Sequence, residues 1–455
     1  MMLIRQKVKE FFRSNPIKVA ILACLVAVVF GLVTQRLPQT LSGRDLTYGY
    51  GSDSPDYWDM VGNLLARHAF MAGPNYGFVF LAPVPGYSYV MQRLPGYPLF
   101  LAAIRGVFPH AAPLSLPFAL GNLVLLFFNT YALVAIFEKY VLKQPPRRLW
   151  VYGWVVLFLP FLAYSNGINS DFLSAVLTLL FCYFFLQDGK AKYWSILFGV
   201  WAVFTRGNVL FFIVPFVLLM LLRHFRLRQM WLLAGSVMLA IVLVMAGWSW
   251  RNYEISGYFK FTTFIGLPLR ENYLEKMEKY SPAFASDSQF SRWNSAQFRA
   301  DYFNSLTVQE GRYKASAQID SELISATIKA VIHYPKLAVK AETRDFAQLF
   351  LNEYFIFNVQ RNFPGLFVLI VCMFLLFIFN GLPSLAFGAA FLIMLLKKQL
   401  DVFAILVYSA FCYAVANALI LGVVSRYLLP VDFVLLYCVM YFSLLVFRRF
   451  FRYNK

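Results

Sequence analysis

The chain has 455 residues, of which 60% are hydrophobic and 14% are charged, about half the charged fraction of an average soluble domain. Apolar runs of membrane length recur along it, so the composition excludes an ordinary soluble protein and predicts an all-α polytopic membrane protein. The net charge of +19 does not indicate nucleic-acid binding, because the basic residues cluster beside apolar segments, where they set the orientation of a chain in a membrane.

The N-terminal segment predicts an uncleaved first span. Basic residues between Arg5 and Lys18 precede the apolar run 19–33, and no small-residue cleavage site follows that run. The positive-inside rule then places the N-terminus in the cytoplasm and residues 36–94 in a first external loop. Within that loop, residues 56–69 carry apolar side chains at helical spacing, which predicts a short amphipathic helix lying on the bilayer surface.

Further spans are expected at about residues 114–138, 149–165, 170–187, 193–205, 208–222, 230–249, 402–422 and 428–447. Basic groups fall in alternate loops, each of which we expect in the cytoplasm. Residues 98–110 are flanked by prolines and interrupted by Arg105, so we expect a half-inserted helix on the outer side. The block 363–396 is too long for one crossing and short for two, which predicts about 11–13 spans in total.

A second external loop is expected over residues 250–362. Its part from 280 to 316 is polar, whereas apolar residues recur at helical spacing between Ala317 and Ile332. Pro335 should end that helix before a second one at 336–350. We therefore predict a single membrane domain, residues 1–455, with two external loops that carry short surface helices.

Two short motifs in the first external loop concentrate acids, a cation and turn residues near the membrane surface. Asp53 begins the first, Asp-Ser-Pro-Asp-Tyr, which ends at Tyr57, and Arg93 begins the second, Arg-Leu-Pro-Gly-Tyr-Pro. The prolines of the second motif restrict the backbone that presents Arg93. Arg206 and Arg426 lie at the predicted outer ends of apolar spans, where a charge is costly unless it is paired or functional.

In their order along the chain, these motifs resemble the polyprenyl-phosphate-sugar transferases of the type C glycosyltransferase superfamily (GT-C). That group includes protein O-mannosyltransferases and lipid A aminoarabinose transferases, and the resemblance covers nearly the whole chain. Further matches in family order are Arg206-Gly207, Trp250-Arg-Asn252, the helix–Tyr–Pro–helix at 317–350 and Arg426-Tyr-Leu-Leu-Pro430. The chain departs from several relatives in having Ser54 where they have Glu after the first Asp, and Arg206 where lysine is often found.

The resemblance implies a GT-C bundle and assigns roles to particular residues. Transfer from a lipid-phosphate sugar requires a carboxylate to take the proton of the acceptor hydroxyl, and cations to hold the phosphate that leaves. By residue-to-residue match the catalytic base is Asp53 rather than Asp56. The expected substrate-binding residues are Tyr57, Arg93, Arg206 and Arg426.

Each of these residues also has a simpler interpretation. Asp53 could cap the surface helix, because Asp, Ser and Pro are common at helix starts. The arginines could anchor the chain by reaching for lipid phosphates at the membrane edge. Tyr57 could belong to the packing between helices. Asp171, near the outer end of its span, resembles an acid seen there in relatives.

We therefore predict an inverting membrane glycosyltransferase of the bacterial inner membrane, with a cytoplasmic N-terminus and a periplasmic active site. Its partners would be a polyprenyl-phosphate-linked sugar donor, a glycan, lipid or protein acceptor of the cell envelope, and membrane lipids, without nucleic acid. A transporter or flippase, and an O-antigen polymerase or ligase acting on lipid-linked glycans, are the alternatives. A transporter should show polar residues at the midplane, whereas the polar residues here gather at one face.

Neither a cofactor nor a metal site is expected. The four histidines are dispersed, and the five cysteines lie within apolar segments without ligand spacing. The lipid-linked sugar would be a substrate rather than a cofactor, and the participation of a divalent metal stays an open alternative.

Overall fold

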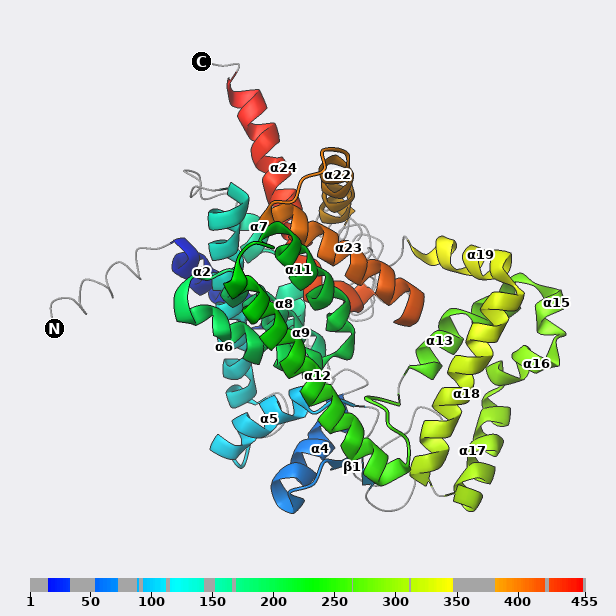
Figure 1. Ribbon diagram of the computed structural model, residues 1–455. Helices are drawn as coiled ribbons and strands as arrows, with labels where there is room; N and C mark the ends of the chain where they lie inside the picture. The colour runs from blue at the N-terminus through cyan, green and yellow to red at the C-terminus, as the bar shows by residue number, and fades with distance from the viewer. Residues whose placement is uncertain are drawn as a thin grey trace.

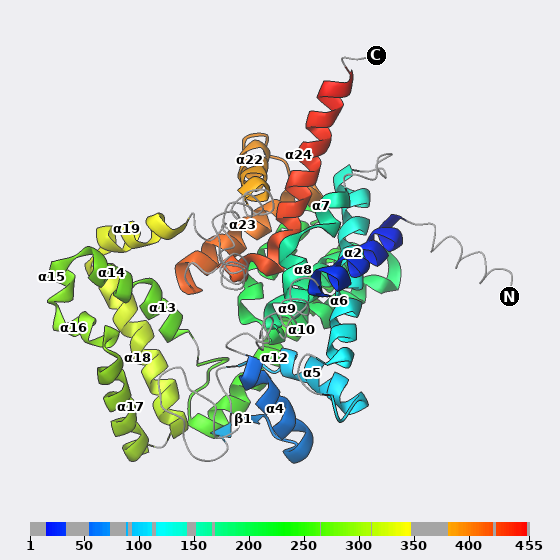
Figure 2. The same cartoon turned by 180° about the vertical axis from the view of Figure 1, so that it is seen from behind.

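The computed structural model describes residues 15–32, 54–72, 88–89, 93–111, 115–142, 152–165, 169–263, 265–310, 312–346, 381–421 and 425–452. Over these residues the chain is helical apart from one short antiparallel ladder between β1 (Met71–Ala72) and β2 (Ser88–Tyr89), in which Met71 pairs with Tyr89. Figure 1 shows a bundle of helices with a separate group of helices on one side, and Figure 2 shows the same division from behind.

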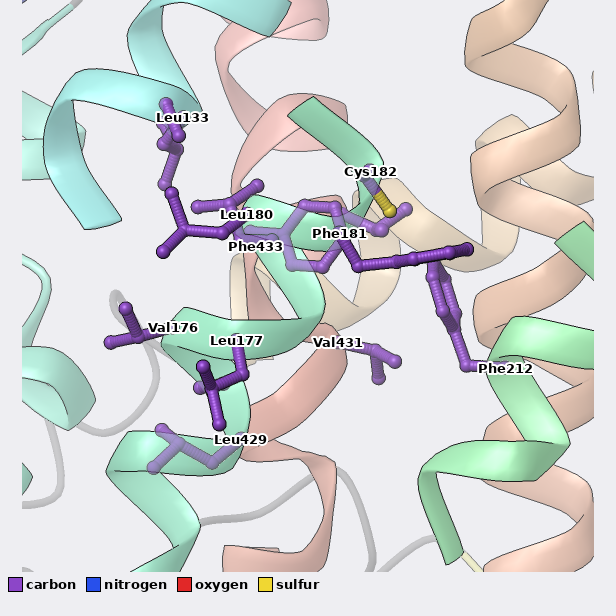
Figure 3. Packing of buried hydrophobic residues seen from close by; sticks show 14 of the residues in the cluster. Leu133, Val176, Leu177, Leu180, Phe181, Cys182, Phe212, Leu429, Val431 and Phe433 are labelled. Atoms are coloured by element: carbon purple, nitrogen blue, oxygen red, sulfur yellow. The ribbon is translucent and has the colours of Figure 1, made fainter. Parts of the chain in front are cut away.

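Helix α9 (Ser170–Phe185) forms the centre of the bundle. It is apolar on all sides and nearly all of its residues are buried, as expected for a helix enclosed by other helices. Its neighbours are α6 (Leu116–Ile136), α10 (Trp194–Thr205) and the 3₁₀ segment Ser425–Val431. In Figure 3, Phe181 of α9 lies in a cluster with Phe212 of α11 (Leu210–Arg223) and Phe433 of α24 (Asp432–Arg452).

The described helices agree with the membrane class. Four of them are long and apolar enough to cross a membrane: Leu116–Leu142, Arg228–Ser256, Val402–Ile420 and Leu428–Val446. Shorter apolar helices lie at or near other expected spans: Asn15–Gly31 (α2), Gly153–Leu162, Ser170–Phe185 and Gly207–Arg223. Two more, Gly96–Val107 (α5) and Leu382–Leu396 (α22), lie at the expected half-inserted segment and within the block 363–396. The span expected at 149–165 is broken into α7 (Gly153–Val156) and α8 (Leu159–Ser165). The total of about 11–13 spans stays a prediction.

Helix α12 (Arg228–Ser256) continues past residue 249, where the sequence predicted the end of its span. It therefore includes residues 250–252, which were expected to open the second external loop. These residue types do not stop a helix, and α12 ends instead at Gly257, whose left-handed φ of 76° is a common C-terminal cap conformation. Asn252 is buried, and its side-chain amide donates to the carbonyl of Lys260 at 2.8 Å, which folds the chain back onto the helix end.

The predicted amphipathic helix is present as α4 (Ser54–Arg67). Its residues Tyr57, Met60 and Val61 are buried against α5 (Gly96–Val107) and the core of the bundle. The expectation that this face lies on the bilayer surface is therefore wrong for these three residues, because protein side chains cover them. Helix α5 has 12 residues and a length of about 18 Å, shorter than the roughly 30 Å of a bilayer core.

The lateral lobe (residues 266–346) has a hydrophobic core of its own. Its stretch 280–316, expected as a polar loop, folds into short helices because Phe284, Phe290 and Trp293 anchor them in this core. The break predicted at Pro335 is confirmed. The helices of the lobe are α13 (Gly266–Asn272), α14 (Leu274–Tyr280), α15 (Pro282–Ala285), α16 (Ser288–Ser291), α17 (Ala296–Glu310), α18 (Arg312–His333) and α19 (Pro335–Phe346).

Buried polar contacts fasten the lateral lobe to the bundle. Asp320 of α18 pairs with Lys260 at 2.9 Å, and its other carboxylate oxygen accepts hydrogen bonds from the backbone N–H groups of Ile265 and Gly266. At the other attachment, the side-chain amide of Asn272 donates to the carbonyl of Ala418 at 2.7 Å. Ala418 belongs to α23 (Val402–Leu421), one of the helices long enough to cross a membrane, so the lobe is docked directly onto the bundle.

Candidate functional site

Arg93 lies three residues before the start of α5, and two residues of α4 hold its side chain. Helices α4 and α5 lie side by side at one end of the bundle (Figure 1). Nη2 of Arg93 lies 3.3 Å from Oδ2 of Asp56, and both side chains are mostly buried. Its guanidinium carbon lies 5.7 Å from the centre of the Tyr57 ring, a cation–π distance. A pure membrane anchor would extend into the lipid headgroups, whereas this side chain is fixed within the protein.

Tyr57 is itself fixed, and this explains how it can orient Arg93. Its hydroxyl donates to Oγ of Ser170 at 3.1 Å, and its ring packs edge-to-face on the ring of Tyr97 with 4.9 Å between centroids. Because the ring is buried and its hydroxyl already has a protein partner, the structure favours packing over direct contact with a sugar for this residue. Tyr57 therefore belongs to the site as a support for Arg93.

A close backbone approach brings the Arg93 motif to the end of α10. A Cβ on Gly96 would lie 2.6 Å from the backbone nitrogen of Thr205, so only glycine fits there. The indole N–H of Trp201 donates to the carbonyl of Gly96 at 3.1 Å across the same contact. Next to this contact, a Cβ on Gly207 would lie 3.7 Å from Cδ1 of Leu94. Arg206 lies between Thr205 and Gly207 in the sequence. The backbone segments that carry Arg93 and Arg206 are therefore in contact with each other.

The close approach of the backbone at Gly96 to Thr205 predicts that a larger residue at position 96 lowers the stability of the protein. Replacing Gly96 with alanine should lower the stability of the protein by about 1–3 kcal/mol, because the added methyl group overlaps backbone atoms that cannot rotate away. Gly106→Ala is the matched control on the same helix, since a Cβ there meets nothing within 4 Å. Thermal unfolding of the detergent-purified variants measures the difference, and equal midpoints for the two would show that the backbones are not in contact.

Arg206 forms an ion pair with Asp171, which lies in the first turn of α9. The side chain of Asp171 is 2% exposed and that of Arg206 is 15% exposed. Asn169 caps the helix by accepting the N–H of Asp171 at 2.7 Å, which fixes the acid at the helix start. Arg206 is therefore not a freely snorkelling residue, because its charge is compensated inside the protein.

Asn208, two residues after Arg206, forms hydrogen bonds with two buried polar residues of α23. The amide of Asn208 donates to the hydroxyl of Tyr413 at 3.0 Å and to Oδ1 of Asn417 at 2.7 Å. These two hydrogen bonds join the 3₁₀ segment Gly207–Val209, which directly follows Arg206, to α23. The position of Arg206 is therefore tied to the packing of the bundle.

Two of the expected site residues cannot be placed in the same way. Asp53 lies outside the described residues, although α4 begins at Ser54, the residue that follows it. Arg426 belongs to the 3₁₀ segment Ser425–Val431, which packs against α9, but its side chain also lies outside the described residues. Within α4, partial burial raises the pKa of the Asp59 carboxyl above its usual value.

The structure thus brings together Tyr57, Arg93 and Arg206 from three distant parts of the chain, and it adds residues that the sequence did not assign to the site. Asp56 emerges as the ion-pair partner of Arg93, and Ser170 as the residue that fixes the Tyr57 hydroxyl. The sequence does indicate a helix start at Ser170, because Asn169-Ser170-Asp171 is a typical pattern before an apolar run. The pairing of Asp56 with Arg93 depends on tertiary contacts and had no local signal.

Comparisons with family models, with curated proteins and with solved structures found no match to this chain. Within the described part of the chain, no group of three or more His, Cys, Asp or Glu side chains is arranged to hold a metal ion. The charged groups that the structure describes at the site are its two arginine–aspartate pairs.

Proposed function

We propose that the protein is an inverting membrane glycosyltransferase that transfers a sugar from a polyprenyl-phosphate donor to a cell-envelope acceptor at the periplasmic face. The observation that carries the proposal is the convergence of Arg93 and Arg206 at the bundle end where α4 starts, immediately after Asp53. In this proposal the many-span GT-C architecture and the external orientation of that end follow from the resemblance and from the positive-inside pattern.

The arginines suit a phosphate leaving group. A guanidinium presents several N–H donors in a planar fork, which can bind two phosphate oxygens at once. Both arginines already hold a carboxylate in this structure, so their geometry is compatible with a tetrahedral or planar oxyanion. As the phosphate separates from the sugar it gains negative charge, and cations already in position would stabilise that change without reorganisation.

The proposed base is Asp53. An acceptor hydroxyl must lose a proton as it attacks the sugar carbon, and a carboxylate within hydrogen-bond reach can take that proton. Attack from the face opposite the departing phosphate gives inversion at the sugar carbon. Asp56, three residues on, is engaged with Arg93, which supports the assignment of the two acids to different tasks: Asp53 to the acceptor and Asp56 to the orientation of the cation.

Replacing Arg93 with alanine should reduce kcat/KM for the donor by roughly ten- to a hundredfold, because one charge-assisted phosphate contact is worth about 1.5–3 kcal/mol. The matched control is Arg67→Ala, which removes the same charge from the exposed end of α4 and should leave donor use within about twofold of wild type, as expected for an exposed charge. Steady-state transfer assays with purified enzyme in detergent give both values. Equal losses at the two positions would show that Arg93 is not a phosphate ligand.

A further inference from the structure

The corner between α18 and α19 carries three aliphatic side chains that are mostly exposed. Ile328 and Ile332 lie one turn apart on α18 and are 51% and 74% exposed, and Val339 on α19 is 62% exposed. One turn before Ile328 on α18, Ile324 is half-buried, and Ser325, which is exposed, is polar. The exposed apolar surface is therefore confined to the end of the helix that leads into α19.

Lysines are interleaved with these aliphatic residues. Lys329, Lys336 and Lys340 are exposed, and the ammonium of Lys340 lies 5.7 Å from the centre of the Tyr280 ring. The sequence from Ser325 to Ala341 contains no acidic residue, and the nearest acids along the chain are Glu322 and Glu342. Lysine beside aliphatic residues on one helical corner is the composition of a surface that meets anionic lipid headgroups, because the aliphatic stems lie along the apolar boundary while the ammonium groups reach the phosphates. A soluble surface of the same size would normally mix acids with the lysines.

The position of the corner agrees with this composition. Helix α19 contacts α23 of the bundle, and α17 is at the opposite end of the lobe in both views (Figures 1 and 2). The lobe is fastened to α23 at Ala418, and the next residue, Leu419, is an exposed apolar residue of that membrane-length helix. The exposed apolar surface of α23 therefore extends to the point where the lobe is attached.

We infer that the α18–α19 corner (Ile328, Lys329, Ile332, Lys336, Val339 and Lys340) is a membrane-contact surface that binds anionic lipid headgroups and seats the lateral lobe on the bilayer. Its three aliphatic side chains insert between the lipids, and its three lysines bind the phosphates around them. This role is independent of the proposed transfer reaction, because none of these residues touches Arg93, Arg206 or their partners.

The test uses the full chain without its five native cysteines, with a single cysteine at Ile332→Cys carrying an environment-sensitive fluorophore. Asn304→Cys, exposed on α17, is the matched control. Both proteins are reconstituted in nanodiscs that contain phosphatidylglycerol and lipids with a nitroxide on the acyl chain. The fluorophore at position 332 should be quenched several-fold more by the nitroxide lipid than the one at 304, and several-fold less by aqueous iodide.

Two outcomes would overturn the inference. Equal iodide quenching at positions 332 and 304 would show that the corner faces water in the purified protein, as a docking site for another protein would. Equal nitroxide quenching with and without phosphatidylglycerol would show that the lysines do not bind anionic headgroups. The triple variant Lys329→Gln, Lys336→Gln, Lys340→Gln supplies the second control, because it should abolish the dependence on phosphatidylglycerol while leaving the folded lobe intact.

Discussion

Asp53→Asn should reduce sugar transfer by about a hundred- to ten-thousandfold, the usual contribution of a general base. The amide has nearly the same shape as the carboxylate but cannot take the proton of the acceptor hydroxyl. The residue directly precedes α4, where the replacement also keeps a good helix-capping group. Expression and thermal unfolding should therefore stay close to those of the wild type, and the loss should lie in kcat.

The matched control is Asp59→Asn, which removes an acid from the next turn of the same helix. This variant should keep transfer within about threefold of wild type, since changes away from the reacting groups usually cost little. Radiolabelled-donor assays at saturating acceptor distinguish the two variants. If Asp53→Asn retained activity within a few-fold of wild type, Asp53 would be only a helix cap, and another group would have to accept the proton.

Arg206→Ala should destabilise the protein by about 3–5 kcal/mol, because it leaves Asp171 buried without its counter-charge. The double variant Asp171→Asn, Arg206→Gln should recover most of that loss, since two neutral amides can remain hydrogen-bonded in the same place. Transfer activity should not recover with it, because the phosphate would still lack its cation. Thermal unfolding and donor kinetics on the same preparations separate these two effects.

Arg206→Lys serves as the conservative control for this pair. It keeps the charge next to Asp171, but it loses the planar fork of donors that the guanidinium provides. We expect stability near wild type and donor use between those of the wild type and the double variant. If the double variant regained full transfer together with stability, the role of Arg206 would be purely structural.

The sequence predicted most of the helices because their signals are local. Apolar periodicity located α4 and α18, and Pro335 marked the break before α19. It failed at the end of α12, where the stop depends on the backbone conformation of Gly257 rather than on polarity. It also failed between residues 280 and 316, since irregularly spaced aromatic residues hold the short helices there only after the lobe core has formed.

The site was predictable as a set of residue types and not as a set of contacts. A charged residue at the end of an apolar span must be paired or functional, and this argument singled out Arg206. Its partner Asp171 lies in the first turn of α9. Which acid pairs with Arg206 depends on how the helices pack around α9, and the sequence does not show that packing. Likewise, the sequence identified the Pro-Gly of the Arg93 motif as a turn, whereas Gly96 is also the point at which two backbones touch.

A donor comparison with the purified protein tests the proposed glycosyltransferase activity most directly. Polyprenyl-phosphate sugars and the matching nucleotide sugars are each offered with cell-envelope acceptors, and the glycosylated acceptor is measured by mass spectrometry. We expect turnover with a polyprenyl-phosphate sugar and none with a nucleotide sugar alone, because the proposed ligands, Arg93 and Arg206, would lie at the membrane edge where a lipid-linked phosphate arrives. Turnover with a nucleotide sugar in the absence of any lipid carrier would contradict this proposal.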